Sequence, residues 1–93
     1  MAILVIANDP SGTPELSAMF KETLGHKALE APGFIFHTDG PVASGGWQIV
    51  DAWETREDFE RWFATEVVPL MPSGAPAGPP PQIFDLETVT VRR

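Results

Sequence analysis

The sequence predicts an α+β fold, a βαββαβ plait in which a four-stranded antiparallel sheet carries two helices on one face. Three observations predict it. Two amphipathic segments alternate with short runs rich in Val, Ile, Phe and Trp. Stretches rich in Pro and Gly separate these segments. The length of 93 residues suits one domain, which is expected to span residues 1–93.

The first strand is predicted at residues 2–8 and the first helix directly after it. The run AILVIAN is continuously apolar, as in a strand buried on both faces, and Asn-Asp-Pro ends it. Thr13 is a good N-cap and Pro14 fits the first helical position. Ala31-Pro32-Gly33 stops the helix. Its apolar residues fall on one helical face: Leu16, Met19, Phe20 and Leu24.

Residues 33–38 and 46–54 are predicted to pair as a hairpin across the turn DGPVASG. Thr55 caps a second helix, TREDFERWFATEVVPLMP, with Phe59, Trp62, Phe63 and Val67 on one face. Residues 72–81 are expected to form a loop or a polyproline stretch, and residues 82–91 the last strand. Right-handed crossovers then place the first and third strands at the sheet centre, the ferredoxin-like arrangement.

Composition and charge exclude several functional classes. The net charge is −7 and no basic stripe is present, so a nucleic-acid partner is not expected. The chain has no cysteine, and its two histidines lack the spaced acidic partners that a metal site needs. The amino-terminal segment has no basic region and too short an apolar run for a signal peptide or membrane span. We therefore expect a cytoplasmic protein with no membrane partner.

Both strands of the hairpin are expected to carry apolar side chains on both sides. On residues 46–54, one side has Trp47, Ile49, Asp51 and Trp53, and the other has Gln48, Val50 and Ala52. On residues 33–38, one side has Phe34 and Phe36, and the other has Ile35 and His37. One side packs on the helices, and the other is expected to face the sheet of a second subunit. The sequence thus predicts a homodimer, with His37 buried whichever way it points.

His37 and Asp51 are the candidate catalytic residues. If residue 41 pairs with residue 47, then His37 lies directly opposite Asp51. The carboxylate would orient the imidazole and raise its basicity. A base with a pKa near neutrality in an apolar pocket can deprotonate a phenol or an acidic C–H. The alternative is a buried polar pair that only fixes the register or the dimer interface.

Aromatic side chains supply the candidate substrate-binding residues. Flat rings at these spacings form either a wall for a flat, apolar molecule or part of the core or interface. Phe63 lies on a helix face, where it is equally a core residue. The candidate set is Trp62, Trp53, Trp47, Phe36 and Phe63.

Residues 32–69 resemble the antibiotic-biosynthesis-monooxygenase-like family of dimeric α/β barrel proteins. Pro32-Gly33 opens a strand, a Gly-rich turn follows, and the next strand ends in DAWETREDFERW. There Asp51, Trp53 and Thr55 match the acid, the tryptophan and the helix cap of the family pattern. The chain differs from the polyketide-anthrone oxygenases of the family, because it has no clear Asn-x-x-x-Trp helix pattern and no tyrosine.

The resemblance implies two plaits that form one α/β barrel, and a reaction without a cofactor. In it, a buried pocket lets a deprotonated phenolic substrate react with O₂. The first hypothesis is therefore a monooxygenase of secondary metabolism for an aromatic or polyketide-like molecule, with His37 as base and Asp51 as its orienter. A non-redox cyclase or isomerase using the same base is a variant of it. The other hypotheses are a non-catalytic dimeric module for a hydrophobic ligand, and a haem-binding protein.

Overall fold

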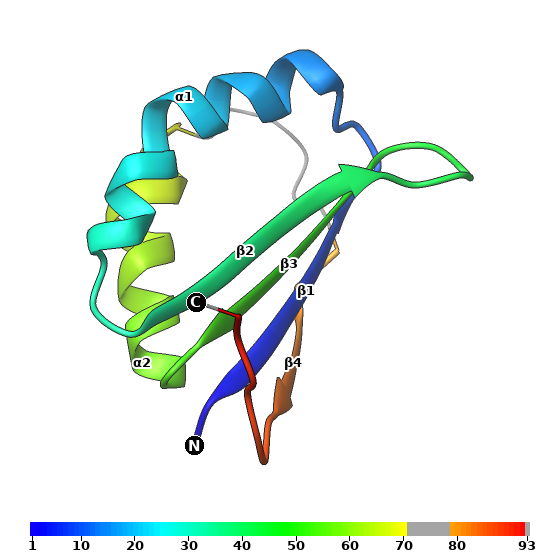
Figure 1. Ribbon diagram of the computed structural model, residues 1–93. Coiled ribbons are helices and arrows are strands. Elements are labelled where there is room, and N and C mark those ends of the chain that lie inside the picture. The colour runs from blue at the N-terminus through cyan, green and yellow to red at the C-terminus, as the bar shows by residue number, and fades with distance from the viewer. Residues whose placement is uncertain (71–78, 93) are drawn as a thin grey trace.

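The computed structural model describes residues 1–70 and 79–92 and has the predicted βαββαβ order. Its elements are β1 (Ile3–Asp9), α1 (Pro14–Glu30), β2 (Phe34–Pro41), β3 (Trp47–Trp53), α2 (Arg56–Trp62) and β4 (Gln82–Asp85). A π-helical turn at Phe63–Val67 and a 3-10 turn at Val68–Leu70 continue α2. The antiparallel sheet has the order β2-β3-β1-β4, and both helices lie on one face of it (Figure 1). The predicted fold, with β1 and β3 central, is confirmed.

Both helices begin at the predicted caps. The backbone N–H of Leu16 donates to the hydroxyl of Thr13 at 3.1 Å, and the N–H of Asp58 donates to that of Thr55 at the same distance. Each bond satisfies one of the free N–H groups of a first helical turn. Across residues 1–70 and 79–92, no helix has the length and apolarity needed to cross a membrane.

The core lies between the central strands and α2. Ile3 and Val5 of β1, Trp53 of β3 and Phe59 of α2 are buried, and Trp53 is only 1% exposed. The ring of Trp53 packs edge-on against Phe34, with centroids 5.5 Å apart. On the apolar face of α1, Leu24 is buried, whereas Met19 is 43% exposed.

A β-bulge corrects the predicted faces of β2. Downstream of it, the predicted register is confirmed, with Pro41 opposite Trp47 and His37 opposite Asp51. Between Phe34 and Phe36 the register shifts by one residue, so Phe34 pairs with Trp53 and Phe36 with Ala52. Because a bulge inserts an extra residue, Phe34 shares a face with His37, and Phe36 lies on the opposite face. The expectation that the two phenylalanines share one side is wrong.

The last strand is shorter than expected. It ends at Asp85 and not at residue 91, although the N–H of Leu86 still donates to the carbonyl of Ala2 at 2.8 Å. The following residues turn back across the sheet face that the helices leave open (Figure 1). Of the loop predicted at residues 72–81, positions 72–78 lie outside the described residues.

We predict that a methyl group at Gly46 destabilises the fold. Gly46 has a φ of +84°, and a Cβ there would lie 2.6 Å from the carbonyl oxygen of Asp9, a backbone atom that cannot turn away. Gly46→Ala should lower the free energy of unfolding by about 2 kcal/mol, measured by urea denaturation. Gly40→Ala is the matched control, because a Cβ at Gly40 meets no atom within 4 Å. Equal stabilities of the two variants would contradict this close approach.

Candidate functional site

The helix-facing side of the sheet carries a polar cluster at its β2 edge. His37 lies opposite Asp51, and Asp51 lies opposite Val5, which is buried under the helices. Asp39 follows His37 by two residues, so both side chains are on the same face of β2. We call Asp39, His37 and Asp51 the Asp–His–Asp cluster. It brings together the two predicted catalytic residues and a third residue that the sequence analysis missed.

Hydrogen bonds connect this cluster to three elements. The Nδ1 atom of His37 is 2.6 Å from Oδ1 of Asp51, and its Nε2 atom is 2.8 Å from Oδ2 of Asp39. The second carboxylate oxygen of Asp39 accepts from the hydroxyl of Ser17 at 2.9 Å and from the indole N–H of Trp47 at 3.0 Å. The cluster thereby ties the edge strand β2 both to β3 and to the first turns of α1.

The two carboxylates hold His37 in its charged form. Hydrogen bonding to Asp51 is the largest cause that raises the pKa of His37, from 6.5 to about 9; partial burial opposes the rise and Asp39 adds to it. For Asp39, burial alone would raise the pKa, but hydrogen bonds from Trp47, His37 and Ser17 lower it below its usual value. At neutral pH the imidazolium therefore donates from both nitrogens, one to each carboxylate.

Two expectations about His37 are wrong. Its pKa is not near neutrality but about 9, chiefly because its ring hydrogen-bonds to Asp51, with a further rise from Asp39. Its side chain is not buried in this chain but 43% exposed, since β2 is an edge strand. The signal for Asp39 was present in the sequence as an acid two residues after the histidine, a spacing that places both on one face of a strand.

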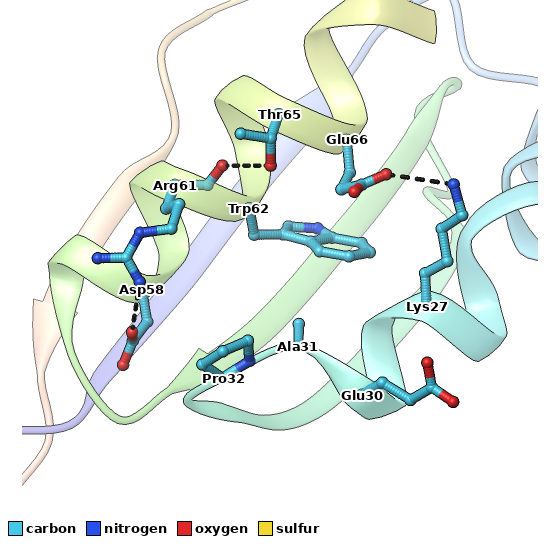
Figure 2. Close-up of a pocket in the computed structure, with 9 residues that line it drawn as sticks. All are labelled: Lys27, Glu30, Ala31, Pro32, Asp58, Arg61, Trp62, Thr65 and Glu66. Carbon is cyan, nitrogen blue, oxygen red and sulfur yellow. Dashed lines mark hydrogen bonds and ion pairs between the residues drawn. The ribbon is translucent and has the colours of Figure 1, made fainter.

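The five candidate substrate-binding residues do not line one site. Trp47 belongs with the Asp–His–Asp cluster through its bond to Asp39. Trp53 and Phe63 pack in or against the core, and Phe36 lies on the opposite sheet face. Trp62 lines a cavity of about 270 Å³ between the end of α1 and α2 (Figure 2). The aromatic wall expected from the sequence is therefore divided among separate places in the fold.

His37 and Asp51 do not line either of the following two surface cavities of the described residues. The first is the one beside Trp62. The second, of about 440 Å³, lies where residues 89–91 approach Ile35 and Glu54. Within residues 1–70 and 79–92, no group of three or more His, Asp and Glu side chains is arranged to hold a metal ion. The cluster is thus a partly open surface feature of the single chain.

We predict that the cluster stabilises the fold most at acidic to neutral pH. The folded pKa of His37, about 9, lies above the ordinary value of 6.5. The stabilisation is therefore complete below about pH 6.5 and is lost as the pH rises towards 9. Because the side chain is 43% exposed, solvent screening limits the effect to on the order of 1 kcal/mol. Urea denaturation at pH 6 and pH 9.5 measures it. In His37→Gln the difference between the two pH values should shrink by that amount; an unchanged difference would contradict the ion pairs.

The described fold is shared with the solved structures of two other proteins. The haem-degrading protein MhuD of Mycobacterium tuberculosis, in a haem-free form, is 23% identical, with a TM-score of 0.65 over 97% of this chain and 99% of that chain. A second structure of MhuD, with two haems in its active site, is 18% identical, with a TM-score of 0.53 over the same shares.

The cofactor-independent oxygenase SnoaB of Streptomyces nogalater, solved in a mutant form, gives a TM-score of 0.54 at 16% identity. This match covers 95% of this chain and 94% of that chain. No protein-family model and no curated protein sequence matches the chain. The likeness thus lies in the fold, over nearly the whole chain. The protein has the ferredoxin-like fold of the antibiotic-biosynthesis-monooxygenase-like proteins MhuD and SnoaB, which confirms the resemblance read from its sequence.

Proposed function

We propose that the protein is a cofactor-independent oxygenase that acts on an aromatic hydroxy compound bound beside the Asp–His–Asp cluster. The observation that carries the proposal is the cluster itself, a histidine between two carboxylates on the helix-facing side of the sheet. It lies in a fold shared with SnoaB, a cofactor-independent oxygenase. The substrate class is an apolar, polyketide-like molecule, because the proposed chemistry needs an electron-rich ring system.

The proposed reaction uses the substrate's own electrons to reduce O₂. A base removes a proton from a phenol or an activated ring CH₂ group, and the resulting anion reacts with O₂. For a ring CH₂, one oxygen atom becomes the new C=O group, and the other leaves as water with the two hydrogens. Atoms and electrons balance without a further reductant. The protein has to supply the base and a place for the anion.

His37 is the proposed base and Asp51 the group that orients it. Asp51, the largest cause of the raised pKa of His37, makes the neutral imidazole a stronger base and a better match to a phenol with a pKa of about 10. For an unperturbed histidine, the transfer of the phenol proton would be uphill by more than three pKa units. The neutral form is rare, on the order of 1% at pH 7. A substrate must also take the place of Asp39 at Nε2 of His37.

The same base without O₂ would perform a cyclisation or isomerisation, which is the second candidate. It shares the proton abstraction and differs only in what the anion does next. The favouring observation is again the His37–Asp51 contact at 2.6 Å, since that contact serves any proton transfer. Product formation under anaerobic conditions separates the two candidates.

We further propose that two chains associate through the sheet face opposite the helices. Leu4 of β1 and Phe84 of β4 are cross-strand partners on that face, and Phe84 is 48% exposed. Val91 adds a 43% exposed side chain from the carboxyl-terminal segment. Pairing this face with its copy would remove these apolar groups from water.

We predict that turnover of a polycyclic phenol follows the neutral form of His37. O₂ uptake should rise with pH to a midpoint near 9, and His37→Ala should lower it by roughly 10²-fold or more. Asp39→Asn should move the midpoint to lower pH, because one of the two carboxylates that hold the proton becomes neutral.

Asp85→Asn is the matched control for that experiment, since Asp85 lies on β4, at the other edge of the sheet from His37. It should leave both the rate and the midpoint unchanged. Full activity of His37→Ala would exclude His37 as the base, and undiminished product formation without O₂ would exclude an oxygenase.

We predict a dimer in solution that depends on Phe84. Light scattering at micromolar concentration should give twice the chain mass, and Phe84→Glu should reduce it to that of one chain, because a buried charge opposes association. Leu29→Glu is the control, since Leu29 is 76% exposed on α1, away from the proposed interface. A single-chain mass for the unmodified protein would refute the dimer.

A further inference from the structure

The Asp39 carboxylate is held by more than its ion pair with His37. Its Oδ2 atom accepts from Nε2 of His37 at 2.8 Å. Its Oδ1 atom accepts from the hydroxyl of Ser17 at 2.9 Å and from the indole N–H of Trp47 at 3.0 Å. The Asp39 side chain is 27% exposed, and an ion pair that solvent reaches contributes little by itself. The two further donors therefore fix where this carboxylate lies.

These two donors come from different parts of the fold. Ser17 lies near the start of α1, and Trp47 is the first residue of β3. Asp39 pairs with Ile49, so Trp47 is its diagonal neighbour on the same face of the sheet. The turn before α1 restrains this tryptophan in addition, because a Cβ at Gly12 would lie 2.5 Å from the Cβ of Trp47. The carboxylate is thus held between a helix and a strand, independently of the histidine.

A carboxylate fixed in this place covers the free side of the imidazole. Nδ1 of His37 contacts Asp51, so Nε2 is the ring nitrogen that remains for a substrate. Asp39 contacts that nitrogen and favours the protonated ring, which is not a base. The charged groups that act on His37 are these two carboxylates, and the group that α1 brings to the cluster is the neutral hydroxyl of Ser17. The histidine is therefore charged and covered as long as Asp39 stays in place.

We propose that Ser17 and Trp47 are positioning residues that hold Asp39 as a gate over Nε2 of His37. The gate keeps the histidine inactive as a base until a neutral, hydrogen-bonding molecule takes the place of Asp39. The purpose of such a gate rests on the proposed oxygenase function, whereas the gate itself can be tested in the free protein.

Two simpler roles of these residues make different predictions. If Ser17 and Trp47 only withdrew negative charge from Asp39, their removal would strengthen its bond to His37 and raise the pKa of the histidine. If they only joined α1 to the sheet, the pKa of His37 would not depend on them. A gate predicts a fall, because a released carboxylate spends less time on Nε2.

NMR titration of the ring protons of His37 measures this pKa. It should fall in Ser17→Ala and in Trp47→Phe, and the combined variant should show at least half of the fall seen in Asp39→Asn. Ser17→Thr keeps a hydroxyl and should keep the pKa. In the Asp39→Asn background, Ser17→Ala should have no further effect. Ser11→Ala is the matched control, because it removes a hydroxyl from the turn before α1 that donates outside the cluster, and it should leave the pKa unchanged.

Diethyl pyrocarbonate, which modifies neutral imidazole, tests the access to Nε2. At pH 7, its reaction with His37 should become severalfold faster in Ser17→Ala. His26, an exposed histidine of α1, is the internal reference, and mass spectrometry of peptides reports both rates.

Circular dichroism verifies that each variant keeps its fold, and the two serine variants suffice if Trp47→Phe does not fold. An unchanged or raised pKa of His37 in Ser17→Ala, or equal effects of Ser17→Ala and Ser11→Ala, would overturn the gate. These results leave the oxygenase proposal intact, because His37 and Asp51 are unchanged in both variants. If the pKa falls as expected and no variant oxidises a phenol, the gate stands and the oxygenase proposal fails.

Discussion

The pairing of β2 with β3 is the constraint on which the candidate site depends. Beyond the bulge, the register places His37 opposite Asp51 on the helix-facing side. A slip by one residue would turn both side chains of β2, His37 and Asp39, to the other sheet face. Neither the contact with Asp51 nor the bond from Ser17 of α1 to Asp39 could then form. Backbone pairing therefore decides the electrostatics of the cluster.

The same constraint fixes where the helix and the sheet meet. Asp39 accepts from Ser17 and from Trp47, so one carboxylate joins α1, β2 and β3 at the end of the sheet that the aromatic core does not reach. The core around Trp53 holds the opposite end by apolar contact. The helix layer is thus fixed to the sheet by two kinds of interaction, one sensitive to pH and one not.

The order of elements, both N-caps and the central strands followed from the sequence because each rests on local signals: periodicity, capping residues and Pro or Gly stops. The register of the hairpin was only assumed from the sequence, and the structure has the assumed pairing of Pro41 with Trp47 and of His37 with Asp51. The bulge at Phe34 and Phe36 did not follow from the sequence, because an inserted residue leaves no mark in an apolar run. The third member of the cluster was missed for a different reason. An acid near a histidine becomes a candidate partner only when both are known to share a face and one ring N–H of the histidine still needs an acceptor, as Nε2–H of His37 did.

For the proposed reaction, the second carboxylate changes what kind of base His37 would be. With Asp51 alone, the imidazole would keep a free nitrogen for a substrate. When Asp39 is bound as well, the proton affinity of the His37 imidazole rises. Its availability as a base falls, because both ring nitrogens donate to carboxylates. Such a base would suit weakly acidic substrates that can compete with Asp39 for Nε2. Substrates that already ionise in water do not need a base of this strength. The arrangement therefore favours a phenol or a ring C–H of low acidity over a carboxylic acid. In the proposed reaction, a substrate would have to displace Asp39 from His37, although Ser17 and Trp47 hold Asp39 in place.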